Sequence, residues 1–323
     1  MHPLAQRLLA LQEQIRAAVR DAQTRHQSAE LSQVDRVGDD DTIFTIDVHA
    51  ERVLLAHCEA WGREEPLRLC AEGLPQEGVV FGRGEPRWRL LVDPIDGTRP
   101  LMHDKRSAWS LAAIAPERGE ATRLADVVVA SMTELPPSWQ TSHARLWSVR
   151  GGGSHGDRTH AGGHPNPIAV QPSPAKSLRF GFVASCNFFL GAKDLIARIE
   201  EEILRRHLDL PEPWRAEVYT DLYMSSGAQI AELALGRDRF ALDVRPRAHA
   251  KLGQARALCS HPYDLCTALI AQEAGCIITD LDGATFDAAM QTTGDVGWIG
   301  YANAELAQRL QPLVEAVLRQ FLN

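Results

Sequence analysis

The sequence predicts a layered fold of mixed helices and strands, of the α/β or α+β class. Two observations support this class. Short apolar segments bounded by Gly and Pro, which are typical of strands, occur in both halves of the chain together with helical segments. In addition, the chain has 323 residues, 45% hydrophobic and 24% charged, which is sufficient for one large domain or two packed ones. Such a mixture is expected to bury its apolar faces between packed layers.

The elements of the first half follow from local patterns. Residues 1–26 carry apolar side chains at spacings of three and four, which predicts an amphipathic helix. These side chains are Leu4, Leu8, Leu11 and Ile15. Gly and Pro at 83–86 predict a turn that joins residues 78–82 and 88–92 into a hairpin. The other elements expected here are an acidic loop at 35–41, a helix at 46–61, and strands at 67–71, 109–115, 126–131 and 145–149.

The middle of the chain differs in composition from its surroundings. Residues 150–175 are rich in Gly, His, Pro and Asn and lack an apolar period, so we expect a flexible loop between an N-terminal half, 1–149, and a C-terminal half, 176–323. The histidines of this segment match no standard zinc spacing, and we interpret them as solvated. The elements expected after the loop are strands at 178–184, 240–244 and 276–279 and helices at 193–207, 225–235, 262–275 and 303–322.

Charge and cysteine usage limit the class of protein. A formal net charge of -8 argues against a general binder of nucleic acids or membrane surfaces, because phosphate groups would be repelled. No apolar run approaches the roughly 18 residues of a membrane span, and the N-terminus has no secretory pattern. The six cysteines form no C-x-x-C pair, which disfavours a zinc or thioredoxin-like site. We therefore expect reduced, mostly buried thiols in a cytoplasmic protein.

The segment Asp93-Pro94-Ile95-Asp96-Gly97-Thr98 carries the strongest chemical signal. It follows an apolar strand candidate, and aspartates rarely adjoin a core strand unless their charge is compensated. The spacing allows both carboxylates to face one ion, and Gly97 permits a close backbone approach. The residues that follow predict a turn into a helix, whose free N–H groups would bind an anion. We therefore expect a metal and phosphate site here, in preference to a plain Asp-Pro turn.

This segment resembles the D-P-[IL]-D-[GS]-T motif of the inositol monophosphatase family and its fructose-1,6-bisphosphatase relatives. Further segments resemble the family in the same order along the chain. They are Asp41-Thr42-Ile43-Phe44-Thr45-Ile46-Asp47 with Glu51, Cys70-Ala71-Glu72-Gly73, and Tyr263-Asp264 with Glu273-Ala274-Gly275. Taken singly, Asp47, Glu72 and Asp264 favour helix caps or a turn, but their ordered coincidence with Asp93 and Asp96 favours the family. The departures suggest a divergent subfamily: Gly73 replaces a second Glu, Tyr263 replaces Trp, and Arg99-Pro100 follows the central motif.

The resemblance implies the αβαβα sandwich of the sugar phosphatases, two or three Mg²⁺ ions, and a role for each matching residue. The implied metal ligands are Glu72, Asp93, the Ile95 carbonyl, Asp96 and Asp264, all of them hard oxygen donors. The implied catalytic residues are Asp47 and Thr98, which would position and deprotonate a metal-activated water, together with Glu72. The N–H groups of Gly97 and Thr98 would hold the phosphate.

The implied function is that of a Mg²⁺-dependent phosphomonoesterase for a small phosphorylated polyol or sugar, in a homodimer as relatives often are. The alternatives are a 3′-phosphoadenosine-5′-phosphate or fructose-1,6-bisphosphate phosphatase and, in a different class, a catalytically silent binding protein. Asp243 falls where family members often carry an acid that binds substrate hydroxyls. Arg245 and Arg247 open a basic stretch that extends to Arg256. This stretch is either a solvated loop or a site for a second phosphate or a nucleotide.

Overall fold

The computed structural model describes residues 1–37, 42–209, 216–254 and 258–322. Its helices are α1 (Pro3–Arg25), α2 (Ser28–Leu31), α3 (Thr45–Glu64), α4 (Thr98–Met102), α5 (Lys193–Leu208), α6 (Ser226–Ala234), α7 (Arg245–Lys251), α8 (Ala268–Ala274) and α9 (Ala304–Leu322). Its strands are β1 (Val34–Val37), β2 (Thr42–Phe44), β3 (Leu67–Ala71), β4 (Val79–Phe81), β5 (Trp88–Asp96), β6 (Ala108–Pro116), β7 (Val129–Leu135), β8 (Ser142–Val149), β9 (Ser154–His160), β10 (Asn166–Pro167), β11 (Gly181–Ser185), β12 (Val218–Asp221), β13 (Asp238–Asp243), β14 (Ile277–Thr279) and β15 (Trp298–Tyr301).

Two large sheets organise these elements. Within the described ranges, the first sheet has eight strands in the order β10-β9-β8-β7-β6-β5-β3-β4, and β3 and β5 are its parallel pair. The second sheet has five strands in the order β12-β11-β13-β15-β14, with β11 parallel to both of its neighbours. A separate two-stranded sheet pairs β1 with β2 ahead of α3.

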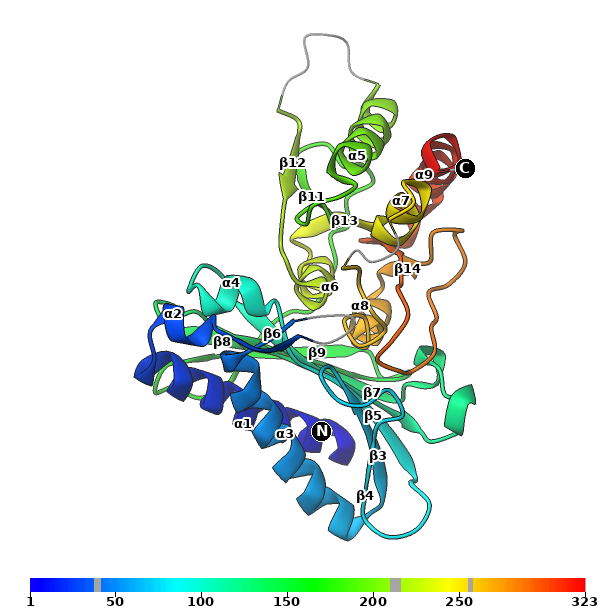
Figure 1. Ribbon diagram of the computed structural model, residues 1–323. Coiled ribbons are helices and arrows are strands. Elements are labelled where there is room, and N and C mark those ends of the chain that lie inside the picture. Colours follow the sequence, from blue (N-terminus) through cyan, green and yellow to red (C-terminus); the bar gives the residue numbers. More distant parts are fainter. Residues whose placement is uncertain (38–41, 210–215, 255–257, 323) are drawn as a thin grey trace.

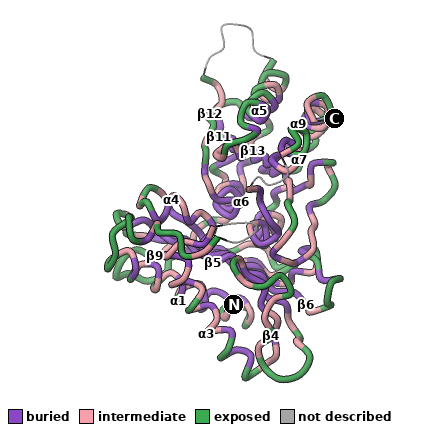
Figure 2. The backbone as a smooth tube through the Cα atoms, viewed as in Figure 1, coloured by how far each residue is buried: buried purple, intermediate pink, exposed green. Residues whose placement is uncertain are grey.

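The helices separate and cover the two sheets, which gives five layers. Helices α1 and α3 cover one face of the first sheet, α6 and α8 lie between the sheets, and α5 and α9 cover the far face of the second (Figure 1). Buried positions accordingly follow the strands and the inner helix faces, whereas exposed positions lie on the outer helices (Figure 2). The αβαβα sandwich implied by the sequence is therefore confirmed.

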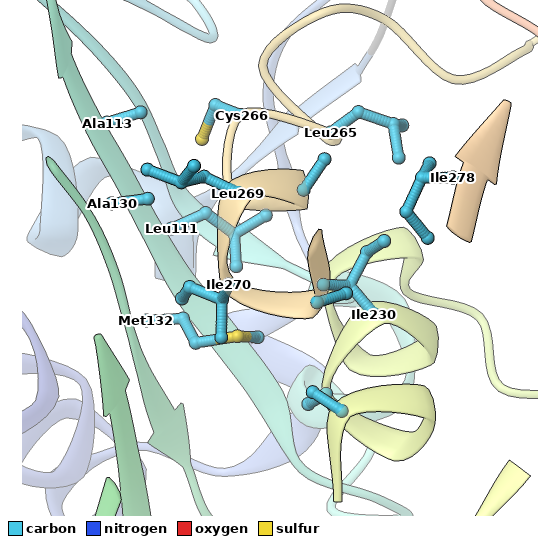
Figure 3. Close-up of a cluster of buried hydrophobic side chains, with 14 of the residues drawn as sticks. Leu111, Ala113, Ala130, Met132, Ile230, Leu265, Cys266, Leu269, Ile270 and Ile278 are labelled. Carbon is cyan, nitrogen blue, oxygen red and sulfur yellow. The ribbon is translucent and has the colours of Figure 1, made fainter. Parts of the chain in front are cut away.

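The side chains of each central strand point alternately to the two faces of the first sheet, so one strand packs against the helices on both sides. On β6, Leu111 and Ala113 face the layer of α6 and α8, whereas Ala112 and Ile114 face α1 and α3, because neighbouring side chains of a strand point to opposite faces. Figure 3 shows the first of these interfaces, where side chains of α8 and of α6 pack against the first sheet. Both faces of the first sheet are thus buried, which explains why the sequences of its central strands are continuously apolar.

Helix α1 is fixed on the first sheet by one buried polar side chain. The Gln12 amide donates hydrogen bonds to the carbonyl oxygens of Ser110 and Ser131, each at 2.9 Å, and its oxygen accepts one from the Ser131 hydroxyl at 2.9 Å. Gln12 has no exposed surface, so each of these bonds forms away from water. The contact joins α1 to both β6 and β7.

We expect Gln12→Ala to lower the free energy of unfolding by about 1–3 kcal/mol, because it leaves buried carbonyl and hydroxyl groups without partners. Urea denaturation followed by circular dichroism measures this change. Gln6→Ala is the matched control, since Gln6 is exposed on the same helix and its replacement should change the free energy by less than about 0.5 kcal/mol. Equal effects of the two variants would contradict the anchoring role.

The predicted hairpin of residues 78–82 and 88–92 is wrong. Strand β4 pairs antiparallel with β3, from Leu67 opposite Phe81 to Leu69 opposite Val79. Strand β5 then pairs with the other edge of β3, in parallel. The turn at 83–86 therefore carries the chain across the end of β3, which local turn residues do not specify.

The predicted flexible loop at 150–175 is also wrong over much of its length. Residues 154–160 form β9, which pairs antiparallel with β8, and β10 pairs with β9 in turn. The strand is polar because it lies near the sheet edge, where an ion pair between Arg145 and Asp157 at 2.6 Å links it to β8. The first sheet thus extends beyond residue 149, and the division of the chain into two halves stays a prediction.

Smaller differences concern element length and some missed elements. The helix predicted at 262–275 is shorter, since α8 begins at Ala268, and the predicted basic loop after Asp243 contains α7. Strands β12 and β15 were not predicted, and β1 takes up part of the acidic loop, whose residues 38–41 lie outside the described ranges. All six cysteines are buried and free, as expected. A search of the described helices finds none that is long and apolar enough to span a membrane.

Candidate active site

The 93–98 segment ends β5 at the centre of the first sheet. A regular strand would point Asp93 and Asp96 to opposite faces, since they are three residues apart. The pairing with β6 shifts here, because Asp93 lies opposite Leu111 and Asp96 opposite Trp109. This bulge places one extra residue on β5 and turns both carboxylates toward the same side. Gly97 follows with φ +95°, a left-handed conformation that favours glycine, and α4 begins at Thr98.

Three carboxylates gather at this end of β5. One oxygen each of Asp93, Asp96 and Asp264 lies within 4.8 Å of the others. Asp264 comes from the turn ahead of α8, where it accepts a hydrogen bond from the His261 N–H at 2.6 Å. Burial, followed by repulsion from neighbouring carboxylates, raises the pKa of Asp93 well above its ordinary value. Burial likewise raises the pKa of Asp96 to about 6 and, with the charge of Asp96, that of Asp264 to about 7.

This donor set fits a hard divalent cation. Two buried carboxylates and a half-buried one at this distance repel one another strongly when ionised, so a compensating positive charge is needed. Glu72, in the turn after β3, and Ile95 line the same cleft. All five predicted metal ligands therefore meet in one place, and all of them are oxygen donors, which suits Mg²⁺.

The orientation of Asp96 is fixed by the start of α6. Its carboxylate accepts hydrogen bonds from the Ser225 hydroxyl at 2.9 Å and from the Gly227 N–H at 2.5 Å. A side chain at Gly227 would meet Leu111 at 2.5 Å and the Asp96 carboxylate at 2.9 Å, so only glycine allows this approach. These contacts were not anticipated, although Ser-Ser-Gly ahead of an apolar helix is a recognisable N-terminal capping pattern.

Thr98 and Asp47 form a second unit beside the carboxylates. The Thr98 hydroxyl lies 3.0 Å from Asp47 Oδ1 and 2.7 Å from the Ile95 carbonyl oxygen, and its single proton can serve one of them at a time. The other oxygen of Asp47 accepts a hydrogen bond from the Phe44 N–H at 2.8 Å, which fixes the carboxylate at the start of α3. The structure thus brings Asp47 next to Thr98, and the catalytic role of the pair stays a prediction.

The three residues predicted to bind substrate differ in their access to the cleft. Asp243 has no exposed surface and holds the Arg245 guanidinium through three contacts of 2.6 to 3.1 Å. Arg247 points elsewhere, pairs with Asp282 on the surface, and is absent from the described lining of the cleft. We therefore do not retain Asp243 and Arg247 as substrate contacts, since one is enclosed and the other is remote. Arg256, at the end of the predicted basic stretch, lies outside the described residues.

Arg245, the third of these residues, lines the cleft, and it is surrounded there by side chains that the sequence did not indicate as substrate contacts. The guanidinium of Arg245 also donates to the Ser260 hydroxyl at 2.8 Å and to the Leu258 carbonyl at 3.2 Å. Its carbon lies 4.9 Å from the centroid of the Phe188 ring. Arg99 lines the same cleft, 5.2 Å from the ring centroid of Phe189. Two of these residues carried a signal in the sequence, namely Arg245 in the basic stretch and Arg99 as a departure from the family pattern, whereas Phe188 and Phe189 carried none.

Solved structures share this architecture at low sequence identity. The extragenic suppressor protein suhB from Bartonella henselae is 16% identical, with 97% of this chain and 99% of that chain covered and a TM-score of 0.65. Fructose-1,6-bisphosphatase from Leishmania major is 13% identical, with 97% and 93% covered and a TM-score of 0.71. An IMPase from Thermotoga maritima is 18% identical, with 98% and 99% covered and a TM-score of 0.61.

These likenesses establish the fold, and the family follows from the sequence match. A search among curated proteins finds no match to this chain. The pattern that describes the inositol monophosphatase family, however, matches residues 2–318, which is nearly the whole chain. The match therefore includes the central motif, the Thr98–Asp47 pair and the distant Asp264. On this evidence, the chain belongs to the inositol monophosphatase family.

Proposed function

We propose that this protein is a Mg²⁺-dependent phosphomonoesterase that hydrolyses a small phosphorylated polyol or sugar. The observation that carries the proposal is the meeting of Asp93, Asp96 and Asp264 in one cleft with the Thr98–Asp47 pair. The carboxylates would hold the cation together with Glu72 and the Ile95 carbonyl. Bound Mg²⁺ would neutralise the phosphate and increase the acidity of a water molecule.

The protein's own residues supply the proton acceptor and the orientation. The Thr98 hydroxyl would donate its proton to Asp47 Oδ1, 3.0 Å away, with the Ile95 carbonyl oxygen reserved for the proposed cation site. The Thr98 oxygen would then accept the proton of an attacking water while Asp47 takes up the hydroxyl proton. Gly97 and Thr98 line the same cleft, and their backbone N–H groups would hold the phosphate oxygens.

Phosphate release from a panel of esters, measured with Mg²⁺ and with EDTA, tests the proposal. We expect turnover that depends on Mg²⁺ and falls by about 10²–10⁴-fold in Thr98→Val, because the isosteric side chain cannot relay a proton. Thr98→Ser is the matched control and should keep most of the activity, since it restores the hydroxyl. No turnover of any ester by wild-type protein that binds Mg²⁺ in a calorimetric titration would indicate a silent binding protein instead. The homodimer stays a prediction.

A further inference from the structure

The turn between α4 and β6 carries an arginine that is bound to the segment ahead of α6. The Arg106 guanidinium donates one hydrogen bond to each oxygen of Asp221, at 3.0 and 2.6 Å. Its carbon lies 3.6 Å from the centroid of the Tyr223 ring. The Tyr223 hydroxyl in turn donates a hydrogen bond to the Ser107 carbonyl oxygen at 3.0 Å. Two neighbouring residues of the turn thus hold two residues of the segment, and we call these four residues the Arg106 clasp.

The clasp lies directly ahead of the residues that orient Asp96. The Tyr223 carbonyl oxygen accepts hydrogen bonds from the Ser225 N–H and from the Gln229 side-chain amide, each at 2.9 Å. The Ser225 hydroxyl then donates to the Asp96 carboxylate at 2.9 Å. Tyr223 and Ser225 are both buried. A short series of contacts therefore leads from the clasp through Ser225 to Asp96.

The same contacts join the two large sheets. Arg106 lies in the turn that leads into β6 of the first sheet, whereas Asp221 ends β12 of the second. The contact between Ser225 and Asp96 crosses the same boundary, since Asp96 ends β5 of the first sheet and Ser225 is the N-cap of α6. The length of that contact therefore depends on how firmly the segment ahead of α6 is held against the first sheet.

The geometry of the clasp favours orientation over simple charge attraction. The Arg106 and Asp221 side chains are 39% and 31% exposed, and the attraction in such a pair contributes little by itself. The two hydrogen bonds, however, fix the plane of the guanidinium against the carboxylate, and the Tyr223 ring lies against the same group. A lysine could keep the charge but not this paired geometry.

We propose that Arg106 is a positioning residue for the cation site, and that the clasp raises the affinity of this site for Mg²⁺ by holding Ser225 and the start of α6 against Asp96. The inference rests on the proposed function, because Asp96 belongs to the proposed metal set. A carboxylate that is already held in one orientation loses less freedom when it binds a cation, so groups that orient metal ligands raise the affinity. Arg106 acts only through these contacts, since it is absent from the described lining of the cleft.

Calorimetric titration of the full chain with Mg²⁺ alone tests the inference. Arg106→Gln and Asp221→Asn break the clasp from its two sides, and each should raise the Kd for Mg²⁺ about 10-fold. Arg106→Lys should have a smaller effect, and it carries the test together with Asp221→Asn if Arg106→Gln does not fold. In assays of phosphate release, the Mg²⁺ concentration that gives the half-maximal rate should rise by the same factor, with kcat at saturating Mg²⁺ little changed.

Arg145→Gln is the matched control for a loss of stability. Arg145 also holds a carboxylate by two hydrogen bonds, to Asp157 at 2.8 and 2.6 Å, and it too is absent from the described lining of the cleft. Its replacement should lower the melting temperature and leave the Kd for Mg²⁺ unchanged. A merely structural role of Arg106 predicts the same result for Arg106→Gln, so the Kd distinguishes the two roles.

A double-mutant cycle decides whether Arg106 acts through Ser225. Ser225→Ala should weaken Mg²⁺ binding about 10–100-fold, and Arg106→Gln should weaken it little further in that background. Fully additive losses, or a Kd that no clasp variant changes, would overturn the inference while the phosphatase stands. Mg²⁺ binding that depends on the clasp, without hydrolysis of any ester, would overturn the proposed function and support the inference. Wild-type protein that binds no Mg²⁺ would overturn both.

Discussion

Asp93→Asn is expected to lower Mg²⁺-dependent phosphate release by about 10³-fold or more, corresponding to ~4 kcal/mol of transition-state stabilisation. Asp93 stands at the centre of the cluster, and its pKa is raised by burial and then by the charges of Glu72, Asp96 and Asp264. Replacing it removes one negative charge from the proposed cation site while the amide oxygen can still accept the hydrogen bond from the Ile95 N–H, now at 2.9 Å. Activity near that of the wild type would contradict a metal-binding role.

The same substitution should stabilise the metal-free protein. Because the folded-state pKa of Asp93 lies above its unfolded value, the folded state holds the proton more tightly, and stability declines as pH rises through the folded pKa. Asn cannot ionise and avoids that loss. In EDTA, the melting temperature of the variant should therefore exceed that of the wild type at pH 8 by more than at pH 5. Added Mg²⁺ should raise the wild-type melting temperature and raise that of the variant much less.

Arg245→Met is expected to lower the free energy of unfolding by about 3–5 kcal/mol, because it leaves the Asp243 carboxylate buried without its cation. Asp243 has no exposed surface, and Arg245 is 4% exposed. Denaturant titration at neutral pH measures the loss. Arg247→Met provides a close control, since Arg247 lies on the same helix and pairs with Asp282 at the surface. An exposed pair of this kind contributes less than about 1 kcal/mol.

A double variant separates the ion pair from the packing. Asp243→Leu combined with Arg245→Met removes both charges, and a buried pair replaced by apolar residues often costs little. We expect the double variant to regain most of the stability that Arg245→Met loses. If Arg245→Met and Arg247→Met had equal effects, or if the double variant were the least stable, the loss would not come from an unpaired carboxylate.

The strongly periodic helices could be predicted from the sequence because their pattern is local. Helix α1 could be predicted because its apolar residues recur at spacings of three and four, which places them on one face of a helix. Helices α3, α5 and α9 also lie close to their expected ranges. Strand β9 could not be predicted in the same way. Its polar residues fit a position near the sheet edge, and its pairing with β8 and β10 makes it a strand. Likewise, no turn signal indicates that β3 lies between β4 and β5.

For the site, the sequence by itself determined the residues of the central motif and the oxygen chemistry of the metal set. Asp93, Asp96, Gly97 and Thr98 are neighbours in the chain, so their chemistry could be read locally. The family resemblance named Asp264 and Asp47 as distant partners of this motif, and the fold brings them to it. The tertiary structure alone decided that Asp243 is enclosed with Arg245 and that Arg247 lies at the surface. Whether a charged side chain is available to a ligand depends on its burial and its partner, and these are properties of the packed fold rather than of the residue type.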